Sequence, residues 1–241
     1  MKNQVIAITT LAAILSLPSA LRAEEAAQPL KKDDRIVFFG DSITQAGVKP
    51  QGYVTVITAA IKSANPDLGI ETFGAGVSGN KVPNLQARLE NDVIAKKPTL
   101  VFIYIGINDV WHWKMDKEGK LLGGGTTKEI FESGLKDIIA KINAAGARVI
   151  LCTPSVIGEK NDGSNERDAM LEEYSVISRK VATDTGSQLV DLRKAFIDHL
   201  KANNADNAPK GILTGDGVHL NPKGNAFVAA EMGKAIGVEV K

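Results

Sequence analysis

The chain has 241 residues, of which 44% are hydrophobic and 24% are charged, a composition typical of a globular domain and not of a disordered or fibrous protein. Its formal net charge is +1, with both signs interspersed and no dense basic run, so nothing indicates binding to nucleic acid or to anionic lipid. The single cysteine, Cys152, ends an apolar run and is interpreted as a buried small hydrophobic residue without a catalytic role.

The N-terminal segment has the order of a secretory signal peptide: Lys2, an apolar run over residues 5–17, and small residues up to Ala23. We expect cleavage after Ala23 and export to the periplasm or the extracellular space. Leu21 occupies the position three residues before the expected cut, where alanine is more usual, which leaves an uncleaved amphipathic anchor as the alternative. The apolar run is shorter than the roughly 20 residues that a membrane helix requires, so we expect no stable membrane insertion.

After a short polar leader over residues 24–34, one domain is expected over residues 35–241, in which short apolar runs alternate with amphipathic segments. This alternation predicts a three-layer α/β domain with a parallel sheet, whose catalytic groups gather at the carboxyl ends of the strands. The predicted strands are residues 36–39, 70–73, 100–105, 149–151 and 188–192. The predicted helices are residues 53–64, 83–96, 127–145, 168–184, 194–202 and 222–236.

Ser42 lies just beyond the first predicted strand, where a helical turn follows and presents backbone amides. A serine nucleophile needs a base within hydrogen-bond reach, itself oriented by a third group. Of the three histidines, His199 falls in a helix, whereas His219 follows Asp216 by three residues in a loop before the last helix. This spacing allows the Asp216 carboxylate to orient the imidazole, although a capped surface turn would also explain it.

Two loops contain groups suited to stabilise an oxyanion. The Gly-rich stretch over residues 74–79 is predicted to be a flexible loop in which the Gly76 amide can approach closely, and residues 106–109 offer the side-chain amide of Asn108. Asp41 and Asp109 are interpreted as local caps that hold their own loops in shape. The glycines of residues 74–79 also fit a dinucleotide-binding fingerprint, but they do not follow the first strand, and no acidic residue ends the next one.

Four ordered blocks, over residues 40–43, 76–79, 106–109 and 216–219, resemble the SGNH/GDSL hydrolase family, with Ile43 where leucine is often found. The resemblance implies a flavodoxin-like, five-stranded parallel sheet. It implies Ser42 as nucleophile, with Asp216 and His219 as its partners. The oxyanion hole would be formed by the Ser42 and Gly76 amides and the Asn108 side chain. The resemblance also implies hydrolysis of esters or thioesters without a cofactor or a metal.

The insertion that follows Asn108 contains both tryptophans, Trp111 and Trp113, together with His112 and a triple glycine at residues 123–125. These aromatic residues are candidate substrate contacts, and the alternative is that they only pack the loop onto the domain. A polar stretch over residues 155–167 could form the opposite wall of a pocket.

For the function we expect an exported esterase acting on short acyl esters, most simply acetyl groups on carbohydrate. A lysophospholipase or thioesterase of the same family is the enzymatic alternative. A non-catalytic carbohydrate-binding protein on the same scaffold is the alternative from another class, but no triad or oxyanion residue is missing. No sequence feature indicates an oligomeric state.

Overall fold

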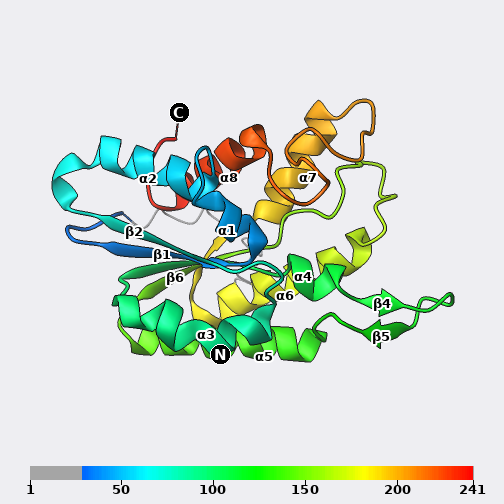
Figure 1. The fold of residues 1–241 in the computed structure, drawn as a ribbon, viewed down its shortest axis with the longest axis horizontal. Helices are drawn as coiled ribbons and strands as arrows, with labels where there is room; N and C mark the ends of the chain where they lie inside the picture. Colours follow the sequence, from blue (N-terminus) through cyan, green and yellow to red (C-terminus); the bar gives the residue numbers. More distant parts are fainter. Residues whose placement is uncertain (1–28, 241) are drawn as a thin grey trace, which may run out of the picture.

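The computed structural model describes residues 29–240; the predicted signal peptide over residues 1–23 lies outside them. A parallel sheet forms the middle layer, in the order β2-β1-β3-β6-β7, with helices on both faces (Figure 1). The predicted three-layer α/β fold with five parallel strands is therefore confirmed. The strands are β1 (Arg35–Gly40), β2 (Glu71–Gly76), β3 (Leu100–Tyr104), β6 (Arg148–Cys152) and β7 (Gln188–Val190).

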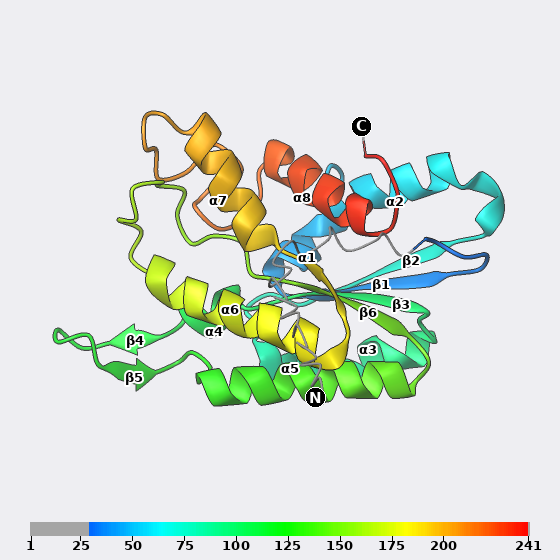
Figure 2. The same cartoon turned by 180° about the vertical axis from the view of Figure 1, so that it is seen from behind.

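The helices form two layers. One face of the sheet carries α1 (Ser42–Gly47), α2 (Tyr53–Ala64), α7 (Leu192–Asn203) and α8 (Pro222–Ala235), and the other carries α3 (Val82–Asp92), α5 (Lys128–Ala144) and α6 (Asp168–Thr185) (Figures 1 and 2). Short helical turns are η1 (Pro66–Leu68), η2 (Ile94–Lys96) and α4 (Ile107–Trp111). No helix within residues 29–240 has the length and apolarity needed to cross a lipid bilayer.

The central strands are apolar because helices cover them on both sides. Residues 36–39 of β1 are fully buried, and Phe38 stacks on Phe102 of β3 with ring centroids 5.1 Å apart. The apolar runs that identified these strands in the sequence are thus the centre of the core.

Three predicted boundaries were wrong. The predicted helix over residues 83–96 ends at Asp92, followed by η2, and the predicted strand over residues 188–192 ends at Val190. Asp191 accepts a hydrogen bond from the Lys194 amide and so caps α7, which begins at Leu192. Residues 74–76 belong to β2 instead of a flexible loop, because they pair in register with residues 38–40 of β1.

The insertion after α4 forms an antiparallel hairpin of β4 (Lys114–Met115) and β5 (Leu121–Gly123), which projects from the body of the domain (Figures 1 and 2). The sequence did not predict this hairpin because its strands are very short and carry no apolar alternation.

The topology brings the loops that follow β1, β2 and β3 to one edge of the sheet. The chain passes from β1 to β2 on one side and then to β3 on the other, so the loops that follow β1 and β3 diverge at a topological switch point. Gly40 lies opposite both Gly76 and Tyr104, which aligns the carboxyl ends of these three strands.

Candidate active site

Ser42 is the first residue of α1 and follows β1 through a single residue, Asp41. The Asp41 carboxylate accepts a hydrogen bond from the Ile43 amide at 3.0 Å and caps the helix. Ser42 Oγ lies 2.9 Å from His219 Nε2. The turn between β1 and α1 therefore delivers the hydroxyl group to the imidazole.

Asp216 orients His219 from three residues earlier in the same loop. Its Oδ2 lies 2.7 Å from His219 Nδ1, while Oδ1 accepts from the amides of Val218 and His219 at 2.9 and 2.7 Å. Partial burial works to raise the pKa of Asp216, but these hydrogen bonds outweigh it and hold the pKa below its ordinary value. A carboxylate on Nδ1 leaves Nε2 as the acceptor for the Ser42 proton.

Glu159, which the sequence analysis did not single out, anchors the chain that leads to Asp216. Its fully buried carboxylate accepts from the amides of Ile212, Leu213 and Thr214 at 2.7, 2.7 and 2.6 Å. The neighbouring Gly158 amide donates to the carbonyl of Gly217 at 2.8 Å. The stretch after β6 thus fixes the loop of Asp216 and His219 through backbone contacts that no local sequence pattern reveals.

The predicted oxyanion donors Gly76 and Asn108 lie at or after the ends of β2 and β3, the two strands that flank β1. Gly76 ends β2 directly under α1: a Cβ there would lie 2.1 Å from the Gln45 nitrogen and 2.8 Å from the Asp41 carbonyl oxygen, so only glycine fits. Asn108 is buried in α4, and its Nδ2 donates to the Asn80 carbonyl at 3.1 Å and lies 3.4 Å from Asp41 Oδ2.

Arg88 of α3, also missed in the sequence, joins the ends of β1 and β2. Its guanidinium donates to the carbonyls of Gly40 and Ala75 at 2.7 and 2.9 Å and to Asn80 Oδ1 at 2.7 Å. It also lies over the Phe39 ring, 4.5 Å from the centroid. The sequence signal that could have identified Arg88 is its position as a charged residue on the helix face that carries Leu85 and Leu89.

Two buried carboxylates, Asp41 and Asp109, lie close to Asn108, one of the predicted oxyanion donors. Burial raises the pKa of Asp41 to about 7. The hydrogen bond from the Ile43 amide lowers this pKa, but the nearby Asp109 carboxylate raises it further. Burial raises the pKa of Asp109 to about 6. Asp41 caps its own turn, as predicted, but the prediction for Asp109 was wrong, because its carboxylate accepts from the distant Val82 amide at the start of α3.

Of the three candidate substrate contacts, only Trp111 borders the cleft beside the triad. Its ring is 6.4 Å from that of His219, and its side chain is 41% exposed. His112 is exposed and does not line this cleft; its ring lies 6.3 Å from that of Trp111, and desolvation together with nearby Lys81 lowers its pKa. The indole of Trp113 packs against Gly125, where a Cβ would lie 2.3 Å from the ring. The remaining histidine, His199, stacks on Phe227 in the α7–α8 layer.

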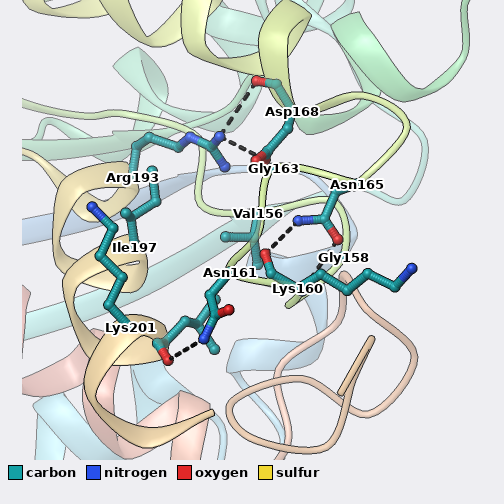
Figure 3. A pocket seen from close by; sticks show the side chains of 11 residues that line it. Val156, Gly158, Lys160, Asn161, Gly163, Asn165, Asp168, Arg193, Ile197 and Lys201 are labelled. Atoms are coloured by element: carbon teal, nitrogen blue, oxygen red, sulfur yellow. Dashed lines mark hydrogen bonds and ion pairs between the residues drawn. The ribbon is translucent and has the colours of Figure 1, made fainter. Parts of the chain in front are cut away.

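The cleft has a volume of about 400 Å³ and runs from Trp111 and the stretch of residues 216–218 to the loop of residues 157–167. Within this loop the Asn165 side chain donates to the Lys160 carbonyl at 2.7 Å, and the Asn161 side chain donates to the carbonyl of Leu200 in α7 (Figure 3). The buried Arg193 pairs with Asp168 at 2.7 Å, also shown in Figure 3. The predicted opposite wall is therefore held in place from its rear side.

The arrangement places a hydroxyl group within hydrogen-bond distance of an imidazole, which in turn contacts a carboxylate. Among the side chains of residues 29–240, no group of three or more His, Cys, Asp or Glu is placed to hold a metal ion.

Comparison with known proteins adds independent findings. The model of the GDSL-like lipase/acylhydrolase family matches residues 38–227. An acetylxylan esterase of Geobacillus stearothermophilus is 32% identical over 225 residues, which cover 86% of this chain and 95% of that protein. The crystal structure of an acetyl xylan esterase, AlAXEase, has 44% identity and a TM-score of 0.78, over 84% of this chain and 99% of the other. The uncharacterized lipoprotein YqeF of Bacillus subtilis (strain 168) is 27% identical over 218 residues, 80% of this chain and 85% of that protein.

Proposed function

Because the chain belongs to the GDSL-like lipase/acylhydrolase family and is a hydrolase of ester bonds, we propose that it removes acetyl groups from carbohydrate esters, with Ser42, His219 and Asp216 as its catalytic residues. The observation that carries the catalytic part is the chain of hydrogen-bond distances of 2.9 and 2.7 Å through these three side chains. The similarity to two acetylxylan esterases supports the substrate class.

In the first step Ser42 Oγ attacks the ester carbonyl carbon and transfers its proton to His219 Nε2. The carbonyl π electrons move to oxygen, which becomes the oxyanion of a tetrahedral intermediate. When this intermediate collapses, the bond to the alcohol oxygen breaks and His219 gives the proton to the leaving alcohol. The acetyl group remains on Ser42 as an ester.

In the second half of the reaction, water removes the acetyl group from Ser42 by the same steps in reverse order. It attacks the acetyl-enzyme carbonyl while His219 accepts its proton, and collapse releases acetic acid as the proton returns to Ser42 Oγ. Asp216 stays ionised throughout and stabilises the imidazolium that forms twice in each cycle, which agrees with its lowered pKa.

The developing oxyanion would be held by the amides of Ser42 and Gly76 and by Asn108 Nδ2. In other serine hydrolases the loss of one such donor costs about 3 kcal/mol of barrier. For Asn108 to serve, its amide must exchange the long 3.4 Å contact with Asp41 for the oxyanion, while the bond to Asn80 keeps the side chain in place.

The same proposal includes export. Residues 1–23 have the order of a signal peptide, and one relative is named a lipoprotein. A polymeric substrate outside the cell would require an exported enzyme. Mass spectrometry of the N-terminus of protein recovered from the periplasm or medium should give a chain beginning at Glu24.

A fluorophosphonate probe tests the nucleophile. Wild-type protein should be labelled, Ser42→Ala should lose labelling and hydrolysis, and Ser63→Ala, a matched change at an exposed serine on α2, should keep both. Labelling that survives in Ser42→Ala would refute Ser42 as the nucleophile. Acetate release from acetylated xylan, compared with fatty-acid release from a long-chain ester, tests the substrate; a preference for the long chain would refute the acetyl proposal.

A further inference from the structure

The cleft beside His219 has an aromatic side and a polar side. Trp111 forms the aromatic side, with its ring inclined at 62° to the imidazole and partly open to solvent. The polar side is the loop of residues 157–167, which contributes Lys160, Ser164, Asn165 and Glu166 to the lining. Such a mixture suits a ligand that has both C–H faces and hydroxyl groups.

The two sides are connected, so their separation is set by the protein. The guanidinium of Arg167, at the end of the polar loop, donates to the Trp113 carbonyl at 3.2 Å and contacts Met115 Sδ at 3.1 Å. Glu159 holds the other end of the loop to residues 212–214. The cleft is therefore built before any ligand arrives, which lowers the entropic cost of binding.

The chemistry of the triad tells which half of an ester enters this cleft. His219 must protonate the leaving alcohol, so the alcohol oxygen has to lie within hydrogen-bond reach of Nε2. The cleft borders His219 through Trp111 on one side and through Asp216, Gly217 and Val218 on the other. The acyl oxygen instead points to Gly76 and Asn108, which do not line the cleft.

We propose that the cleft is the binding site for the sugar ring that carries the ester, with the indole of Trp111 stacked on one face of that ring. The polar groups of the loop at residues 157–167 face the hydroxyl groups of the same or the next sugar unit. This inference rests on the proposed function, because it assigns a place to the alcohol half of the proposed substrate. Trp111 is then a residue that determines specificity for the alcohol.

The test compares two acetate esters that differ only in the alcohol: an acetylated xylooligosaccharide, and ethyl acetate, whose alcohol has no ring to stack. In Trp111→Ala, kcat/KM for the oligosaccharide should fall at least tenfold further than kcat/KM for ethyl acetate, with most of the difference in KM. Trp111→Phe keeps an aromatic face and should recover most of the loss. Leu122→Ala removes another exposed apolar side chain, 63% exposed on the projecting hairpin, and should leave the ratio of the two substrates unchanged.

The outcomes separate this inference from the proposed function. Equal losses on both esters in Trp111→Ala, or no loss on either, would overturn the sugar site while leaving the esterase intact. A wild-type protein that hydrolyses ethyl acetate but not the oligosaccharide would instead overturn the carbohydrate substrate class. A protein inactive on both, and unlabelled by the fluorophosphonate probe, would overturn the proposed function itself.

Discussion

Replacing Glu159 by glutamine tests whether the loop of Asp216 and His219 is held from the stretch after β6. The carboxylate accepts three amide hydrogen bonds, two on Oε1 and one on Oε2. Glutamine keeps one acceptor oxygen, so the amides of Leu213 and Thr214 retain a weaker, uncharged partner. The Ile212 amide then faces an NH2 group and loses its bond in a partly buried position.

The loss in the free energy of unfolding caused by Glu159→Gln can be worked out from these contacts. A hydrogen bond to a charged acceptor contributes about 1.5–3 kcal/mol, and a buried unsatisfied donor costs a similar amount. The loss of one bond and the weakening of two should lower the free energy of unfolding by about 3 kcal/mol. For a domain of this size that corresponds to a decrease in Tm of about 6–12 °C.

Two measurements check this prediction. Calorimetry gives the change in Tm, with Glu90→Gln as a control that makes the same chemical change on the exposed surface of α3 and should shift unfolding by less than about 0.5 kcal/mol. Esterase kinetics well below the Tm should show a lower kcat, because the loop that carries the imidazole loses part of its support. A Tm within about 2 °C of the wild-type value would refute the role assigned to the Glu159 carboxylate.

Two further changes probe the oxyanion loops. Gly76→Ala places a Cβ 2.1 Å from the Gln45 nitrogen, so α1 must move; we expect at least a hundredfold loss of kcat and a lower Tm, and wild-type kinetics would contradict the packing argument. Asp41→Asn removes a carboxyl group whose folded pKa is about 7 against an ordinary 3.8. The Asp41 carboxyl group releases its proton at a higher pH in the folded state than in the unfolded state. The wild-type free energy of unfolding therefore falls as pH rises from about 4 to 7, by at most ~4 kcal/mol. Urea unfolding across this range should show a flatter pH dependence in the variant, and parallel curves would exclude Asp41 as the source.

The sequence predicted the sheet well because its strands are buried on both faces. Each strand is a continuous apolar run, and such runs identify themselves without knowledge of their neighbours. A related reason made Ser42, Asn108 and the residues of the Asp216–His219 loop candidates: each lies where a predicted element begins or ends, and parallel topology brings such positions to one edge. The side chains of Ser42, His219 and Asp216 lie within hydrogen-bond distance of one another, and their catalytic roles stay a prediction.

Contacts between distant segments could not be predicted in the same way. Glu159 bonds to amides more than 50 residues away, and Asp109 bonds to Val82 27 residues earlier. A carboxylate that accepts from backbone amides leaves no pattern in the side chains of its partners, so the sequence around Asp109 suggested only a local cap. The hairpin after α4 escaped prediction because two short strands carry too few residues to show alternation.

Buried charge and exposed surface have separate roles around this site. Asp41, Arg88 and Glu159 are each embedded among the backbone groups at the carboxyl ends of strands or in the triad loop, and the removal of any one leaves buried partners unsatisfied. Changes at Arg88 and Glu159 should therefore lower stability and activity together. Trp111 makes no such hydrogen bonds within residues 29–240 and is partly exposed, so its replacement should alter the choice of alcohol at little cost in stability. Under the proposed role of Trp111, the alcohol specificity can change while the groups proposed to cleave the ester stay fixed.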